Sequence, residues 1–240
     1  MNPLQNILLL GRPASGKSEF IDFMKKQGAT ERLARYHLRQ VAEMDDFPWI
    51  WEKFMEDHLW EEAGFPRRYS FGGSNPGMSK EGVALFDFCI QKFNHEFEKK
   101  YKDNAVFYKD HTLFIEFARG GKNAYATALQ HLSDSILKNS SILFILVSFE
   151  ESKRRNEARY QEKMKSSILA HKVPEETMNW FYQVHDWLEI TGGKENGLLK
   201  VRNIEIPFVT MTNEPELTDS HLLDQRYRPA LARLAELTNV

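Results

Sequence analysis

The sequence predicts an α/β fold, a three-layer sandwich in which helices cover both faces of a mostly parallel central sheet. Continuous apolar runs at 7–10 and 142–147 have the composition of strands buried on both faces. Amphipathic segments with helical spacing lie between such runs, and 80–101 is the longest of them. Because strands alternate with helices along the chain, each crossover can return the next strand parallel to the last.

The expected elements follow in order along the chain. Strands are predicted over 6–10, 36–44, 105–108, 112–117, 142–148 and 205–211. Helices are predicted over 18–27, 49–63, 80–101, 125–138, 150–165, 175–189 and 220–237. We expect one domain over 1–240, with a mainly helical insertion at about 47–102 after the second strand and a lid-like segment at about 150–172.

Composition narrows the class of protein. The 240 residues carry a formal net charge of −2 and include a single cysteine, Cys89. This charge gives no sign of a broad surface for nucleic acid or anionic membranes, and the longest apolar runs are far shorter than the roughly 20 residues that span a bilayer. One cysteine cannot form an internal disulfide, and no signal-like segment is recognisable at the start. We therefore expect a cytoplasmic protein without nucleic-acid or membrane partners, and its oligomeric state is left open.

The segment between the first strand and the first helix matches G-x-x-x-x-G-K-[ST], the phosphate-binding P-loop or Walker A motif. Its eight residues are Gly11, Arg12, Pro13, Ala14, Ser15, Gly16, Lys17 and Ser18. Glycines let the backbone approach phosphate oxygens, and the N–H groups of the loop and the following helix point toward them. Lys17 would reach the β- and γ-phosphates, and the Ser18 hydroxyl would ligate magnesium. The motif predicts ATP and Mg²⁺ as cofactors.

Two adjacent carboxylates, Asp45 and Asp46, follow the second predicted strand. Either could take the proton of an acceptor hydroxyl if it lies opposite the γ-phosphate, and Asp46 is preferred because Phe47 follows it directly. The alternative is that the pair caps the helix that begins near Pro48. Both interpretations stay open, and one residue can serve both purposes.

The strand at 112–117 ends in a carboxylate, Glu116, which could hold magnesium directly or through water. The alternative is a strand-end carboxylate that merely faces solvent. Arg119 could contact a substrate anion or pair with Glu116. Further on, Arg155 and Arg159 lie four residues apart and share a helix face, where their planar guanidinium groups could bind phosphate oxygens. The alternative for this charged run is a solvated helix with internal ion pairs.

Aromatic residues are concentrated in the predicted insertion, where Arg67 and Arg68 could bind a phosphate already present on an acceptor. The aromatic set is Phe47, Trp49, Trp51, Phe54, Trp60, Phe65, Tyr69 and Phe71. Such rings could stack on a base or close over a sugar, although helical spacing favours a core role for Trp49, Trp51 and Phe54. Residues 210–215 lack the guanine-binding Asn-Lys-x-Asp of Ras-type GTPases, and 115–117 lack the Asp-Glu typical of motor ATPases.

With these residues in place, the chain resembles the P-loop nucleoside and nucleotide kinase superfamily. It is most similar to the uridine kinase and phosphoribulokinase group, on the P-loop, Asp45-Asp46-Phe47, the strand ending at Glu116 and the basic run from Lys153 to Arg159. The glycine of that group after Glu116 and the Arg-Asp pair of its lid are absent here. Deoxynucleoside kinases offer a rival match through Glu116 and Arg119, and nucleoside monophosphate kinases a third.

This resemblance implies an enzyme, a phosphotransferase that moves the γ-phosphoryl group of ATP to a small-molecule acceptor such as a nucleoside or nucleotide. It assigns Lys17 to the phosphates, Asp45 or Asp46 to the base, and Arg155 and Arg159 to a lid over the transferring group. The alternative is an ATP-dependent regulatory or protein-binding module with slow hydrolysis.

Overall fold

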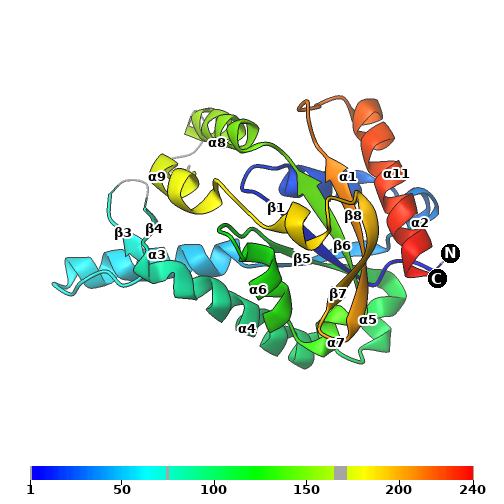
Figure 1. Cartoon of the computed structure of the whole chain (residues 1–240), viewed down its shortest axis with the longest axis horizontal. Helices are drawn as coiled ribbons and strands as arrows, with labels where there is room; N and C mark the ends of the chain where they lie inside the picture. The colour runs from blue at the N-terminus through cyan, green and yellow to red at the C-terminus, as the bar shows by residue number, and fades with distance from the viewer. Residues whose placement is uncertain (1, 74–75, 165–171, 240) are drawn as a thin grey trace.

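A six-stranded sheet forms the centre of the molecule in the computed structural model, which describes residues 2–73, 76–164 and 172–239 (Figure 1). The strand order is β2-β5-β1-β6-β8-β7, and every neighbouring pair is parallel except β7 with β8. The strands of this sheet are β1 Asn6–Gly11, β2 Gln40–Asp45, β5 His111–Phe117, β6 Ser140–Leu146, β7 Asn196–Val201 and β8 Ile204–Thr212. The predicted α/β fold with a mostly parallel sheet is confirmed.

Helices lie on both faces of this sheet (Figure 1). The α-helices are α1 Lys17–Lys26, α2 Ala29–Tyr36, α3 Phe47–Glu62, α4 Ala84–Lys100, α5 Ala105–Asp110, α6 Ala124–His131, α7 Asp134–Leu137, α8 Phe149–Met164, α9 Glu175–Thr177, α10 Trp187–Ile190 and α11 Ser220–Thr238. A 3₁₀-helix, η1, spans Glu81–Val83, and a π-helix, η2, spans Met178–Tyr182. No helix of the described residues is long and apolar enough to cross a membrane.

The alternation of side chains along β1 explains why residues 7–10 are all apolar. Ile7 and Leu9 lie in a cluster with α1, α2 and α11, whereas Leu8 and Leu10 lie in a second cluster with α4, α6 and α7 on the other face. Successive residues of a strand point to opposite faces, so the part of a central strand that is covered on both sides favours apolar residues at every position. Burial in two apolar layers fixes the register and therefore the positions of the strand ends.

The strand ends bring the predicted site residues to one edge of the sheet. The P-loop leaves the carboxyl end of β1, and Asp45 at the end of β2 pairs in register with Glu116 on β5. The connection from β1 passes β5 to reach β2, whereas the connection from β5 passes β1 to reach β6, so the connections of these two neighbouring strands leave in opposite directions. Ligands of open α/β sheets bind in the crevice that this reversal creates at the carboxyl ends.

Two of the predicted strands are wrong in whole or in part. Residues 105–108 form the start of helix α5 and not a strand, because the Asn104 side chain accepts a hydrogen bond from the Phe107 backbone and caps the turn. The strand predicted over 36–44 begins only at Gln40, since Tyr36 ends α2 and His37 follows in the left-handed region with φ 56°. The buried residues at the start of the predicted strand therefore belong to the end of α2 and to its connection with β2.

Three other segments also differ from the prediction. Two predicted helices are interrupted, and one strand was not predicted. The helix expected over 125–138 is divided into α6 and α7, where Ser133 caps the second piece. The helix expected over 175–189 becomes α9, η2 and α10 in succession. Strand β7 was not predicted, because Gly197 and Lys200 interrupt its apolar character, and its hairpin pairing with β8 supplies the stability.

The segment 47–102, predicted as a helical insertion, contains α3 and α4 joined through a short hairpin of β3 Ser70–Phe71 and β4 Gly77–Met78. Helix α3 and this hairpin extend away from the sheet (Figure 1). Ile50 and Phe54 of α3 pack in a third apolar cluster with Phe86 of α4 and Tyr182 of η2. This packing makes the segment one wall of the crevice.

Candidate active site

The backbone of the P-loop requires glycine at two of its positions. Gly11 and Gly16 have φ of 150° and 102°, and a Cβ would lie 2.6 Å from the Ile145 oxygen at Gly11 and 2.3 Å from Asn213 Nδ2 at Gly16. Ala14, between them, also has a positive φ of 54°. Alternation of left- and right-handed backbone turns successive N–H groups to the same side, which forms a concave site for anions.

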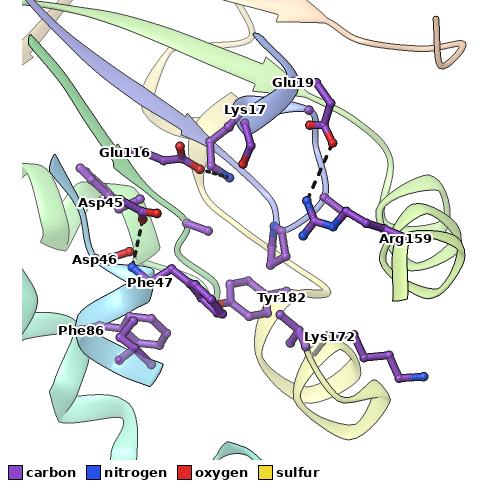
Figure 2. Close-up of a pocket in the computed structure, with 18 of the residues that line it drawn as sticks. Lys17, Glu19, Asp45, Asp46, Phe47, Phe86, Glu116, Arg159, Lys172 and Tyr182 are labelled. Atoms are coloured by element: carbon purple, nitrogen blue, oxygen red, sulfur yellow. Dashed lines mark hydrogen bonds and ion pairs between the residues drawn. The ribbon is translucent and has the colours of Figure 1, made fainter. Parts of the chain in front are cut away.

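Lys17 is the cation that this loop surrounds. Its side chain is buried, and Nζ donates hydrogen bonds to the backbone oxygens of Gly11 at 3.1 Å and Arg12 at 3.0 Å. Nζ also lies 3.9 Å from Glu116 Oε1, and the two side chains face each other across the cavity (Figure 2). Burial lowers the pKa of Lys17, an effect that Glu116 and Asp45 oppose. The ammonium group is thereby held where phosphate oxygens could replace its backbone partners.

Arg12, another P-loop residue, points away from this site. Its guanidinium donates to the backbone oxygens of Val147, Tyr182 and Gln183 at 2.9, 3.1 and 3.0 Å. These bonds join the loop to the end of β6 and to η2. Arg12 therefore fixes the position of the loop and does not offer its charge to a ligand.

Asp45, Asp46 and Glu116 are three of the five carboxylates that line the cavity beside the P-loop, and this cavity has a volume of about 370 Å³. Burial raises the pKa of Glu116 to about 7, and the charge of Asp45 adds to this while Lys17 opposes it. Burial likewise raises the pKa of Asp45 to about 6, with a further contribution from Asp46. Ionised together, these groups repel one another, so a bound cation would stabilise them.

The donor set suits magnesium. Ser18 and Glu116 line the same cavity, and a hydroxyl with carboxylates provides the hard oxygen ligands that Mg²⁺ prefers. Among residues 2–73, 76–164 and 172–239, no three His, Cys, Asp or Glu side chains converge on one point as a metal site. Magnesium commonly takes its remaining ligands from water and phosphates, so Ser18, Glu116 and Asp45 would be sufficient.

Asp46 is held by a buried ion pair with Arg119. Arg119 Nη1 lies 2.6 Å from Asp46 Oδ2, and both side chains are almost fully buried. The guanidinium lies between the rings of Phe86 and Phe117, with 4.6 and 4.9 Å to their centroids, and also donates to the Phe86 and Ala118 oxygens. Burial raises the pKa of Asp46, and Arg119 opposes that change. The predicted alternative that Arg119 pairs with Glu116 is wrong, because the nearer carboxylate is Asp46.

The capping interpretation of the aspartate pair is also resolved by these contacts. Asp46 occupies the cap position of α3 but makes no side-chain capping bond. Asp45 Oδ1 instead accepts from the Phe47 N–H at 3.0 Å. Asp45 thus stabilises the start of the helix while its side chain also lines the cavity (Figure 2).

The two arginines of α8 occupy different environments. Arg159 lines the main cavity, and its Nη1 lies 3.9 Å from Glu19 Oε1 (Figure 2). Arg155 is buried and donates at 2.6 Å both to the Asn213 oxygen and to Glu151. Arg155 therefore anchors α8 to the end of β8. Residues 165–171 of the predicted lid-like segment lie outside the described residues.

A second cavity of about 290 Å³ also borders the P-loop and shares Ala14, Gly16, Glu19 and Arg159 with the first. Asn213 lines it and donates from Nδ2 to the Ser15 oxygen at 2.8 Å, while its Oδ1 accepts from Arg226. Tyr227 and Leu217 add apolar surface. The carboxylates and this second cavity therefore both border the P-loop. A triphosphate bound between an acceptor molecule and the nucleobase of its own nucleotide would require such an arrangement.

Arg67 and Arg68 are not near this centre. Arg67 donates to Glu61 and to Ser70, and the Arg68 guanidinium lies 5.1 Å from the Tyr69 ring. Neither arginine lines the cavities at the P-loop formed by the described residues. Their predicted contact with an acceptor phosphate is not supported, because both side chains are used in the turn that follows α3.

Other residues reach the site without having been singled out from the sequence. Phe86 and Tyr182 line the main cavity beside the carboxylates (Figure 2). Both lie within segments predicted as helices, Phe86 in 80–101 and Tyr182 in 175–189. The aromatic run at 180–182 was the one available signal, and the π-helix that turns Tyr182 inward could not be recognised from spacing.

The sequence matches no protein-family model and no curated protein. Its structure is similar to a gluconokinase from Sinorhizobium meliloti 1021, with a TM-score of 0.48 and 12% identity over 100% of this chain and 96% of that one. A sugar kinase from Janibacter sp. HTCC2649 gives 0.42 and 11% over 98% of each chain. Shikimate kinase from Acinetobacter baumannii gives 0.40 and 15% over 92% and 89%. At these values the likeness does not decide what this chain does.

Proposed function

We propose that this protein is a cytoplasmic ATP-dependent kinase that transfers the γ-phosphoryl group to a hydroxyl of a small molecule. The observation that carries this proposal is the arrangement of Lys17 opposite Asp45, Asp46 and Glu116 in one cavity beside the P-loop. Glu116 and Asp45 would be used to hold magnesium for nucleotide binding, and Asp46 is the further carboxylate that binding alone does not require. An acceptor hydroxyl needs both a proton acceptor and a metal-bound phosphate in reach.

The nucleotide would bind with its phosphates in the P-loop and its nucleobase in the second cavity, beside Asn213. Lys17 would exchange its bonds with the Gly11 and Arg12 oxygens for phosphate oxygens. Ser18, Glu116 and Asp45 would hold magnesium, which would neutralise the charge that develops on the phosphates. The raised pKa values of the two carboxylates mean that binding of the nucleotide and metal is favoured as the pH rises through about 6 to 7.

Asp46 is proposed as the base. A new bond forms between the acceptor oxygen and the γ-phosphorus while the bond to the bridging oxygen of ADP breaks, and the hydroxyl proton passes to Asp46 and then to solvent. The raised pKa of Asp46 makes it a stronger proton acceptor than an exposed aspartate. Arg119 acts as a positioning residue, because its ion pair and its packing between two rings fix the carboxylate. Asp45 remains the alternative base.

Arg159 is the arginine proposed to stabilise the transferring phosphoryl group. It lines both cavities and is partly exposed, so its guanidinium can approach a phosphate. Arg155 is proposed to hold α8 in place through its bond to the Asn213 oxygen. Placement in the uridine kinase and phosphoribulokinase group, and a nucleoside or nucleotide as acceptor, remain proposals from the sequence motifs.

The test is acceptor-dependent ADP release from Mg-ATP, with nucleosides, nucleoside monophosphates, sugars and hydroxy acids as acceptors. Lys17→Ala is the blank, and Asp46→Asn and Asp45→Asn are compared at equal ATP occupancy. We expect Asp46→Asn to lower kcat by about 10²–10⁴-fold with ATP binding retained. Unchanged turnover in both asparagine variants would refute the base assignment. ATP binding without stimulation by any acceptor would favour the regulatory module.

A further inference from the structure

Helix η2 ends in backbone oxygens for which the helix itself has no donors. This is the general condition of the last carbonyls of a helix, and such groups need partners when they are buried. Arg12 donates to the Tyr182 oxygen at 3.1 Å and to the Gln183 oxygen at 3.0 Å. The Gly121 N–H donates to the Val184 oxygen at 2.9 Å. An arginine of the P-loop thus caps a helix that follows 170 residues later in the chain.

The Arg12 guanidinium uses all three of its nitrogen atoms in such contacts. Nε and Nη2 bond to the end of η2, and Nη1 donates to the Val147 oxygen at 2.9 Å, directly after β6. On the other side, a Cβ at Gly120 would lie only 2.0 Å from the Phe181 oxygen, so backbone packs against backbone there. The planar group donates in fixed directions that an ammonium group cannot reproduce. The P-loop therefore helps to set the position of this end of η2.

Tyr182, the last residue of η2, carries the capped oxygen on its backbone and lines the main cavity with its side chain. Its ring points from η2 into the cavity, toward Phe47 (Figure 2). No residue that the structure describes bonds to its phenol oxygen, which is also not one of the buried polar atoms without a partner. Burial raises the pKa of Tyr182, so the phenol keeps its proton. The hydroxyl therefore faces the open space of the cavity as a donor.

The position of Tyr182 indicates which ligand this donor would meet. Tyr182 lines the main cavity together with Asp46, the proposed base, but it does not line the second cavity beside Asn213. Because the nucleobase is proposed to bind in the second cavity, Tyr182 lies on the side of the acceptor. A π-helix is rare and is frequently found at functional sites.

We infer that Arg12 is a positioning residue for the acceptor: it caps η2 and so holds the Tyr182 hydroxyl in the main cavity, where this hydroxyl donates a hydrogen bond to an oxygen of the acceptor. This inference rests on the proposed kinase function. It gives a role in acceptor binding to a P-loop residue that does not itself line the main cavity.

Fluorine NMR of the whole protein labelled with 3-fluorotyrosine reports on Tyr182 directly. The chain has eight tyrosines, and the signal that is missing in Tyr182→Phe identifies Tyr182. Arg12→Lys keeps the charge and loses the cap. Arg32→Lys is the matched control, because Arg32 also donates three bonds to backbone oxygens, at Met24, Gln27 and Arg39. We expect both lysine variants to lose a similar amount of stability in urea, and only Arg12→Lys to shift or broaden the Tyr182 signal. An unchanged Tyr182 signal in Arg12→Lys would overturn the inference.

The contact of the hydroxyl is tested by ADP release from Mg-ATP, with uridine, uridine 5′-monophosphate, glucose and glycerate as separate acceptors. We expect Tyr182→Phe to raise the KM for an active acceptor by about 2–10-fold, the value of one neutral hydrogen bond, with the KM for ATP unchanged. Arg12→Lys should raise the acceptor KM of the wild type but add nothing in Tyr182→Phe, because it acts through that hydroxyl. An equal rise in both backgrounds would indicate a role in the P-loop alone and would contradict the inference.

These readouts separate the inference from the kinase proposal. ADP release that depends on Lys17, with an acceptor KM that is unchanged in Tyr182→Phe, would support the kinase and refute the contact. Release with none of the four acceptors would count against phosphoryl transfer to them and therefore also against the acceptor contact, even if the Tyr182 signal depends on Arg12. Release that depends on Lys17 and shows the expected changes in KM would support both.

Discussion

Glu116→Gln tests whether the ionised carboxylate of Glu116, which would favour a bound cation, lowers the free energy of unfolding. The pKa of Glu116 is raised from 4.5 to about 7, and its side chain is only 12% exposed. Each pKa unit corresponds to about 1.4 kcal/mol, so the ionised form costs the folded state about 3 kcal/mol relative to the unfolded chain. A carboxyl with a raised pKa in the folded state causes no loss below pH 4.5, and the loss grows until the pH exceeds about 7. Glutamine carries no charge, so Glu116→Gln does not lose stability in this way as the pH rises.

The assay is urea unfolding of wild type and Glu116→Gln at pH 4.5 and pH 8 without nucleotide. We expect the free energy of unfolding of the variant, relative to wild type, to rise by about 2–3 kcal/mol between the two pH values. Mg-ADP should remove part of this difference, because a bound cation favours the ionised Glu116. Glu205→Gln, an exposed carboxylate on β8, is the control and should show no such change. A relative stability of Glu116→Gln that does not depend on pH would refute the reasoning.

Three further substitutions test contacts around the site. Asp57→Asn should cost about 1–3 kcal/mol in urea unfolding, because its carboxylate accepts the N–H groups of three successive residues after α3 and one hydroxyl. Gly120→Ala should lower the free energy of unfolding by about 1–3 kcal/mol, since a Cβ there would lie 2.0 Å from the Phe181 oxygen. Arg119→Lys should lower kcat by about 10²-fold while the KM for ATP is unchanged, because lysine cannot hold Asp46 in the same geometry.

Two of these predictions have a control or a decisive second readout. Gly28→Ala is the matched change for Gly120→Ala, because nothing lies within 4 Å of a Cβ at that position. Equal destabilisation by both would contradict the argument from close approach. For Arg119→Lys, the acid limb of the pH–rate profile should move to higher pH, since the cation that lowers the pKa of Asp46 is weakened. A loss of kcat without that movement would point to a structural role only.

Much of the fold could be predicted from the sequence because its signals are local. The apolar run of β1 and the eight residues that follow it are contiguous, so the strand, the phosphate loop and the start of α1 are fixed by neighbours in the chain. Strand order then places Asp45 and Glu116 in register at the same edge. Short segments were the least predictable, as at 105–110, where a single side chain at Asn104 turned an apolar run into a helix.

The sequence by itself determined that this protein carries a P-loop motif together with a set of acidic and basic residues. Only the tertiary structure decided which partners these residues contact, because the deciding contacts join residues far apart in the chain. Arg119 meets Asp46 across 73 residues, and Arg12 meets the Tyr182 oxygen across 170. Burial of a charge demands the nearest partner that packing supplies, and spacing along the chain cannot reveal which partner that is.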